Sequence, residues 1–162
     1  MERARRAIIA LGANLGDRAG NIEAALAALA RLGRLRARSR LIETEAVIHP
    51  EDEARWHPPF LNAVAILDTA HPPLALLDAL QAIERALGRD RSRETKPWQP
   101  RVIDLDLVAI EDLVLDHPRL TLPHPRLPER RFVLAPLVEV WPDWIHPRLG
   151  LPASALLARL QA

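Results

Sequence analysis

Two aspartates, Asp104 and Asp106, lie one residue apart in the apolar run of residues 102–110. Alternate residues of a β-strand point to the same face, so both carboxylates should project from one side. Neighbouring carboxylates repel each other unless positive charge lies close to them. Mg²⁺ usually takes one or two carboxylates and fills its other positions with phosphate oxygens and water. We therefore predict that this pair binds metal; a solvated strand face, or neutralisation by arginine, is the alternative.

Basic residues cluster on both sides of the aspartate pair. They are Arg89, Arg91, Arg93, Lys96 and Arg101 before it, and Arg119, His124, Arg126, Arg130 and Arg131 after it. A guanidinium is always charged and can bind phosphate through two parallel hydrogen bonds. Carboxylates for a metal and arginines for phosphate, in one stretch, indicate a nucleotide-phosphate site. Because the chain has 22 basic residues, an ordinary surface arginine is the alternative at each position.

Composition favours one soluble domain over residues 1–162. The chain is 49% hydrophobic and 27% charged, with a net charge of +1 and no cysteine. Near-neutral charge gives no overall attraction to nucleic acid or membrane, and absent cysteine excludes disulfide and thiolate chemistry. No apolar run approaches the roughly 18 residues of a membrane span, and the basic start lacks a signal-peptide core. We expect a cytoplasmic protein.

Hydrophobic periodicity predicts an α+β domain. Strands are expected over residues 7–11, 35–43, 60–68 and 102–110, and helices over residues 20–32 and 72–87. This order is the split βαβ plan of ferredoxin-like βαββαβ folds, an antiparallel sheet with helices packed on one face. Two long loops, residues 44–59 and 89–100, interrupt it. After Ile110 the chain is rich in proline, and short helices are expected over about residues 128–138 and at the end.

Eight motifs in order resemble the 6-hydroxymethyl-7,8-dihydropterin pyrophosphokinase family of folate biosynthesis. They are Leu11–Asp17, Phe60–Asn62, Gln81–Glu84, Gly88–Arg89, Trp98–Arg101, Ile103–Leu107, Leu120–His124 and Arg130–Leu137. Together with their surroundings they extend from about residue 7 to about residue 147. The resemblance implies transfer of pyrophosphate from ATP to the pterin hydroxymethyl oxygen, with release of AMP and use of two Mg²⁺ ions. We expect a monomer that binds no nucleic acid and no membrane.

The resemblance assigns catalytic and nucleotide-binding residues. Asp104 and Asp106 would hold the metal ions, while Arg89 and Arg101 would engage the ATP phosphates, with Arg89 the more mobile of the two. The implied ATP-binding residues are Gln81, Glu84, Arg89, Trp98, Arg101, Leu107, Arg119, Thr121, His124 and Arg130. For Gln81 and Glu84, one helical turn apart, a solvated helix face is the alternative. For His124 the alternative is a packed or turn residue, and Arg126 and Arg131 are interpreted as surface charges.

A flat pterin requires stacking surfaces and a side-chain amide. By resemblance, Phe60 and Phe132 sandwich the ring and Asn62 binds its amide-like edge. Thr44 and Val47 reach it from a loop, and Trp98 closes over the site. For the two phenylalanines, ordinary core packing is the alternative.

Two other functions remain open from the residues alone. Ferredoxin-like domains also bind RNA, but stacking aromatics are few and no RNP1-like pattern occurs. Another Mg²⁺-dependent phosphotransferase with a different acceptor would use the same aspartates. The Gly12–Gly16 segment is not a P-loop, because no Gly-Lys-Ser/Thr follows it, and we interpret it as a tight strand-to-helix turn.

Overall fold

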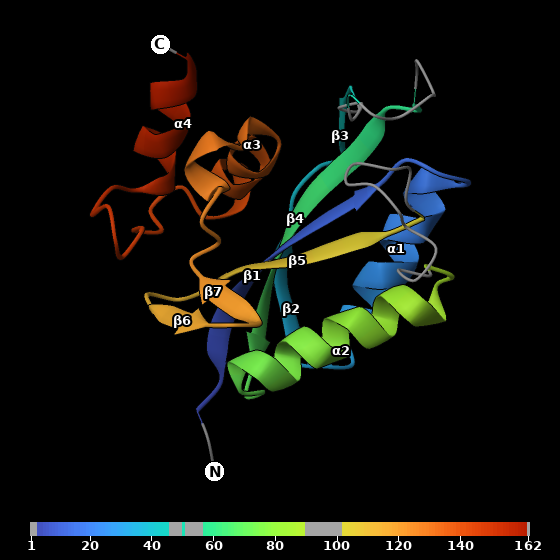
Figure 1. Ribbon diagram of the computed structural model, residues 1–162, viewed down its shortest axis with the longest axis horizontal. Helices are drawn as coiled ribbons and strands as arrows, with labels where there is room; N and C mark the ends of the chain where they lie inside the picture. The colour runs from blue at the N-terminus through green and yellow to red at the C-terminus, as the bar shows by residue number, and fades with distance from the viewer. Residues whose placement is uncertain (1–2, 46–49, 51–56, 90–101, 162) are drawn as a thin grey trace.

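The computed structural model describes residues 3–45, 50, 57–89 and 102–161. Its centre is an antiparallel sheet with the strand order β2-β4-β1-β5, in which β3 also pairs with β4. The strands are β1 (Arg5–Ala13), β2 (Arg34–Arg38), β3 (Ile42–Thr44), β4 (Phe60–Thr69) and β5 (Asp104–Ile110). Strands β1 and β4 lie in the middle and are apolar on both faces, because helices cover the sheet from both sides (Figure 1).

Two helices cover the first face of the sheet, α1 (Arg18–Leu29) and α2 (Pro73–Ala86). The carboxylate of Asp17 caps α1 by accepting the backbone N–H of Gly20 at 3.0 Å. Proline at the first position of α2 suits a helix start, since that N–H needs no partner. Their apolar sides pack on alternate residues of β1, β4 and β5, among them Leu11, Leu67 and Leu105.

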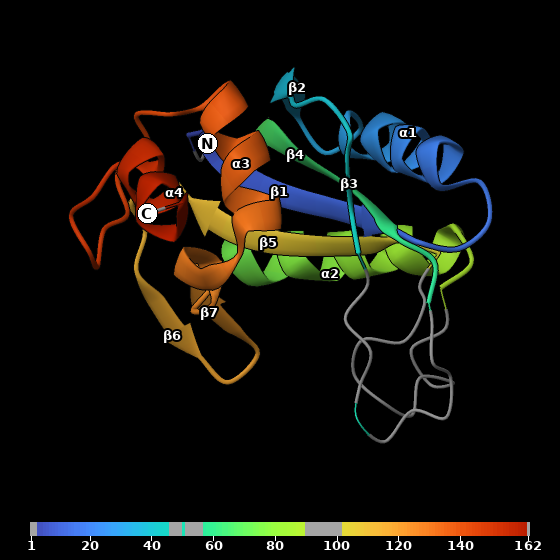
Figure 2. The same ribbon diagram turned by 90° about the horizontal axis from the view of Figure 1, so that it is seen from above.

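The chain after β5 covers part of the second face. It forms the hairpin β6 (Leu115–His117) and β7 (Leu120–Leu122), a 3₁₀ turn at Leu127–Glu129, and helices α3 (Arg131–Val140) and α4 (Ala153–Gln161). Figure 2 shows α3 and α4 on the side of the sheet opposite α1 and α2. They pack on Ile8, Val64, Ile66 and Val108. These contacts lie toward one end of the strands, so the other end of this face is left for the site described below.

Helices α1 and α2 share one face of the sheet, as expected, and the helices after β5 cover part of the other. The structure corrects two sequence expectations. The strand expected over residues 35–43 is two strands, because Ser39 interrupts it: its backbone N–H donates to the Val64 carbonyl at 2.9 Å while its hydroxyl accepts the Val64 N–H at 2.9 Å. The helix expected over about residues 128–138 is instead a 3₁₀ turn at Leu127–Glu129 followed by α3, which starts at Arg131. Within the described residues, no helix is long and apolar enough to span a bilayer.

Candidate active site

Three neighbouring strands bring the candidate residues into two rows across the sheet. Gly12 of β1 pairs with Asn62 of β4 on one side and Asp104 of β5 on the other. Ala10 likewise lies between Val64 and Asp106. Because paired residues point to the same face, the aspartates and Asn62 share the second face, beyond the part that α3 and α4 cover. The antiparallel register therefore sets the distance between amide and acids.

A pocket of about 590 Å³ opens over these rows. Thr44, Phe60 and Asn62 line the part over β3 and β4, and a charged end has Asp104, Asp106, His124, Arg126, Glu129 and Arg130. Phe132 also lines the pocket, with its ring centroid 5.7 Å from Arg130 Cζ. The Asn62 amide donates to the Thr44 hydroxyl at 2.7 Å, which fixes its orientation. Two aromatic side chains and an oriented amide beside a charged end suit a flat heterocycle that carries an anionic or reacting substituent.

Gly12 forms the floor of this pocket between the amide and an aromatic ring. A Cβ atom at this position would lie 3.3 Å from Asn62 Oδ1 and 3.5 Å from Phe60 Cδ1. A side chain at Gly12 would therefore crowd both groups and occupy the space between them. Sequence reasoning interpreted this glycine only as part of a turn.

The turn after β1 also fixes the start of β4. The buried amide of Asn14 donates to the Pro58 carbonyl at 3.0 Å, and Arg18 Nη1 donates to the Pro59 carbonyl at 2.8 Å. These bonds hold the chain directly before Phe60. Asn14 of the Leu11–Asp17 motif and the following Arg18 thus help to position the aromatic part of the pocket.

A second pocket of about 330 Å³ lies beyond the edge of β5, next to α2 and the β6–β7 hairpin. Its lining includes Gln81, Leu107, Arg119 and Thr121. It shares Asp106 and His124 with the first pocket. These two side chains therefore stand at the junction of two sites, where a group could pass from one bound molecule to another.

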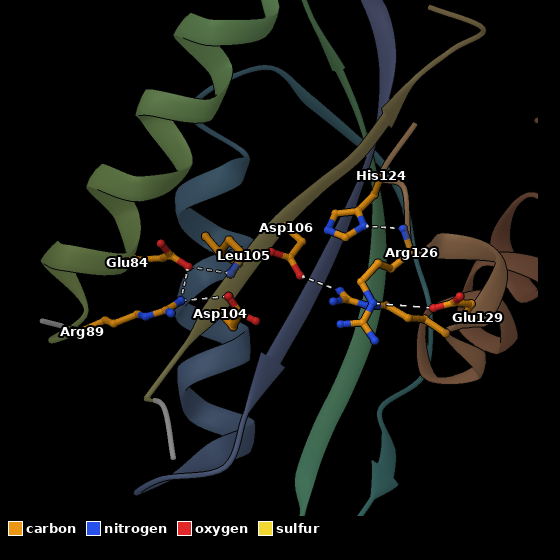
Figure 3. Close-up of polar contacts among 9 residues, drawn as sticks. Glu84, Arg89, Asp104, Leu105, Asp106, His124, Arg126 and Glu129 are labelled. Carbon is orange, nitrogen blue, oxygen red and sulfur yellow. Dashed lines mark hydrogen bonds and ion pairs between the residues drawn. The ribbon is translucent and has the colours of Figure 1, made fainter. Parts of the chain in front are cut away.

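Both aspartates are paired with arginines at the charged end. Asp104 Oδ1 accepts Arg89 Nη1 at 2.8 Å, and Asp106 Oδ2 lies 3.5 Å from Arg130 Nη1. Their side chains are 21% and 33% exposed, so both remain accessible from the pocket. Figure 3 shows the two carboxylates on β5 between the Arg89 and His124 sides of the site. Arginine pairing relieves the repulsion between the acids.

Glu84 and Arg89 form a buried ion pair behind Asp104 (Figure 3). Glu84 Oε2 accepts Arg89 Nη1 at 2.7 Å and the backbone N–H of Leu105 at 2.8 Å. Gly88, with φ +107°, turns the chain after α2 so that the Arg89 N–H bonds the Glu84 carbonyl at 3.0 Å. The pair thereby links the end of α2 to the strand that carries the acids.

This geometry corrects the expected environment of both residues. Glu84 is 1% exposed and Arg89 is 4% exposed. Glu84 therefore does not share the accessible helix face of Gln81, and Arg89 lies buried against Glu84 and Asp104. The reason is electrostatic: a buried carboxylate requires a cation and hydrogen bonds, and Arg89 together with the Leu105 N–H supplies them.

His124 is held in one tautomer at the junction. Its backbone N–H donates to the Val108 carbonyl at 2.7 Å, and its Nδ1 accepts the backbone N–H of Arg126 at 3.2 Å. The neutral ring therefore carries its proton on Nε2, where it can donate to an anion. Burial, assisted by Arg130 and Arg126 and opposed by Asp104, lowers the pKa of His124 to about 4.

We expect the His124 ring to titrate near pH 4 in the free protein. The unfolded chain then binds more protons than the folded chain between pH 6.5 and about 4, so the free energy of unfolding should fall as the pH falls through this window. NMR titration of the His124 ring signals measures this pKa. Added pyrophosphate should raise the pKa, because a bound anion favours the protonated ring. A His124→Gln variant should lose this contribution to acid sensitivity. A ring midpoint near 6.5 would contradict the prediction.

Comparison with known proteins identifies the family. The 7,8-dihydro-6-hydroxymethylpterin-pyrophosphokinase family matches residues 8–142. The 2-amino-4-hydroxy-6-hydroxymethyldihydropteridine pyrophosphokinase of Pseudomonas aeruginosa is 45% identical over 160 residues, which are 98% of this chain and 91% of the relative. The chain belongs to this family. The enzyme of the same name from Synechocystis is 36% identical over 156 residues, covering 95% of this chain and 75% of the relative.

Solved structures of the family share the fold. HPPK-DHPS of Plasmodium falciparum, solved with pteroate, matches 98% of this chain with a TM-score of 0.73 and 16% sequence identity. This chain spans 43% of that protein's length. At this identity the likeness concerns the fold alone. Family membership itself favours the pyrophosphokinase over the RNA-binding module and the other phosphotransferases.

The structure brings together most of the residues singled out in the sequence. The larger pocket collects the expected pterin residues Thr44, Phe60, Asn62 and Phe132 together with the two aspartates and Arg130. The smaller pocket collects Gln81, Leu107, Arg119 and Thr121, and His124 borders both. Val47, Trp98 and Arg101 lie outside the described residues.

Gly12, Arg126 and Glu129 are among the lining residues that sequence reasoning did not assign to the site. The sequence did contain a signal for Arg126. It follows the candidate site residue His124 by two positions, and a tight turn there keeps the two residues side by side. Glu129 had no comparable signal.

The donor set at the charged end fits Mg²⁺. Asp104 and Asp106 offer hard oxygen ligands from one strand, facing the larger pocket. The part of the chain that the structure describes has no group of three or more His, Cys, Asp or Glu side chains arranged to hold a metal. A cation held by two carboxylates would complete its shell with phosphate oxygens and water, which is the usual pattern for Mg²⁺.

Proposed function

We infer that the chain catalyses the reaction of its family, with the two pockets as its active site. Pyrophosphate passes from ATP to the hydroxymethyl group of 6-hydroxymethyl-7,8-dihydropterin, which gives AMP and the pterin pyrophosphate for folate biosynthesis. One observation supports this assignment most strongly. The acidic pair lines a pocket with aromatic and amide groups, and Asp106 and His124 also line a second pocket.

The larger pocket is the proposed pterin site. Phe60 and Phe132 would stack on the ring, and Asn62, oriented by Thr44, would bind its amide-like edge. We propose that Val47 and Trp98 complete this site. The hydroxymethyl group would then point toward Asp104 and Asp106.

The smaller pocket is the proposed nucleotide site. Gln81, Leu107, Arg119 and Thr121 line it, and its triphosphate would extend past His124 toward the acids. Arg130 and, from outside the described residues, Arg101 would neutralise phosphate oxygens. Arg89 would act from its position beside Asp104, and Glu84 would support it rather than touch the nucleotide.

Positioning and electrostatic stabilisation account for most of phosphoryl transfer. The pterin hydroxymethyl oxygen attacks the β-phosphorus in line, the bond from that phosphorus to the α,β-bridging oxygen breaks, and AMP leaves. The hydroxyl proton departs to solvent or to a phosphate oxygen. The neutral His124 ring donates from Nε2 to a non-bridging oxygen, and the arginines balance the developing charge. Bound Mg²⁺, held by Asp104 and Asp106, would neutralise the triphosphate and bring its oxygens toward the acceptor.

We also propose finer features of the molecule. The strand order and its helix connections support a ferredoxin-like fold extended by the helices after β5. Two Mg²⁺ ions would be bound, and the protein would be a cytoplasmic monomer without a nucleic-acid partner.

Product analysis tests the proposed function. Purified protein is incubated with ATP, Mg²⁺ and the pterin, and adenine nucleotides are separated by chromatography. AMP should form in equal amount to the pterin pyrophosphate, only when the pterin is present. Formation of ADP, or ATP consumption that does not depend on the pterin, would refute the assignment.

A further inference from the structure

Arg126 and Glu129 line the charged end of the larger pocket, although the sequence suggested that Arg126 is a surface charge. Arg126 Nε lies 3.6 Å from Glu129 Oε2, and their side chains are 57% and 72% exposed. Figure 3 shows this pair beside His124, across from the aspartates of β5. This position puts the Arg126 guanidinium at the charged end of the pocket, where it could contact a bound anion.

A short turn fixes Arg126 next to His124. The Arg126 N–H bonds His124 Nδ1, the Leu127 N–H bonds the His124 carbonyl at 3.1 Å, and the Glu129 N–H bonds the Arg126 carbonyl at 3.0 Å. Leu127, 1% exposed, anchors the turn in the core. The backbone is therefore fixed, while the guanidinium can rotate within the pocket.

We propose that Arg126 binds the transferred pyrophosphoryl group, and that Glu129 holds its guanidinium before the nucleotide arrives. This inference rests on the proposed function. It adds a phosphate-binding arginine and an exchange of partners that neither the sequence motifs nor the family match assigns to this chain.

The ion pairs of the charged end favour Arg126 for this exchange. Asp104 is paired with Arg89, Asp106 with Arg130, and Glu129 with Arg126. Arg89 is buried at 2.7–2.8 Å from two carboxylates, so its release is costly. The Arg126–Glu129 pair is long and exposed, and such pairs contribute little. An arriving polyphosphate, with more charge and more acceptor oxygens than one carboxylate, should displace Glu129.

Opposite effects of two variants test the exchange. Arg126→Gln should lower kcat/KM for ATP by about 10–100-fold, the usual loss for one charge-assisted hydrogen bond. Glu129→Gln should lower the Kd of a non-hydrolysable ATP analogue with Mg²⁺ by about 2–5-fold, since it releases Arg126 from a weak pair. Arg126→Lys keeps the charge without the fork and should lie between Arg126→Gln and wild type.

Arg131 provides the matched control, because it is an exposed arginine that lies outside both pockets, at the start of α3 shortly after Glu129. Arg131→Gln should leave both measurements unchanged. Wild-type AMP formation is measured first, so that failure of the proposed function is seen separately. With active wild type, Arg126→Gln activity within about 3-fold of Arg131→Gln would overturn the inference. Equal losses in Arg126→Gln and Glu129→Gln would also overturn it, since they indicate a purely structural pair.

Discussion

Replacing Asp106 with asparagine should lower Mg²⁺-dependent turnover by about a thousandfold or more. The amide keeps the shape of the side chain but removes the charge that a divalent cation requires, and metal stabilisation of the transferred phosphoryl group is worth several kcal/mol. The Asp104→Asn, Asp106→Asn double variant should show no measurable turnover. AMP formation is followed over a range of Mg²⁺ concentrations, and the loss should persist at the highest.

Asp116 offers a matched control for this experiment. It is an exposed acid on β6 that pairs with Arg148 at 2.8 Å and does not itself line either pocket. Asp116→Asn should retain normal turnover, and the active-site variants should unfold cooperatively like wild type. Near-normal activity of the double aspartate variant would refute the metal assignment.

Replacing Arg89 with methionine should destabilise the protein by about 3–5 kcal/mol, the usual cost when one partner of a buried ion pair is removed. Glu84 would keep its buried position and its bond to Leu105 but lose its ion pair with Arg89. Asp104 would lose a 2.8 Å hydrogen bond at the same time, so its carboxylate would be less well oriented. Urea unfolding measures the stability, and AMP formation measures the activity.

A double variant separates stability from activity at this pair. Arg89→Met with Glu84→Met removes both buried charges, so much of the lost stability should return. Activity should not return, because Asp104 still lacks its arginine. If the double variant regains turnover along with stability, Arg89 has no role beyond balancing Glu84. If Arg89→Met alone is as stable as wild type, the buried pair is not the link between α2 and β5 that we infer.

The chemical nature of the site was largely predictable from local sequence. Asp104 and Asp106 alternate with leucines, so their common face follows from the strand period alone, and the same period places Phe60 and Asn62 together. The end of α2 at Gly88 was also predictable from local sequence, because the positive φ that ends a helix suits glycine best. The antiparallel α/β architecture followed from the order of periodic segments.

Long-range packing decided the rest, because it sets burial and charge partners that no local pattern contains. Glu84 follows Gln81 by one helical turn, yet the approach of β5 buries it against Arg89, while Gln81 stays in a pocket. The strand register placed Gly12 between Asn62 and Asp104, and a core leucine held Arg126 beside His124. Sequence alone thus determined which groups the chain has for phosphate chemistry and on which strand faces they lie. Only the tertiary structure decided which of them face the pockets, since burial and pairing depend on residues distant along the chain.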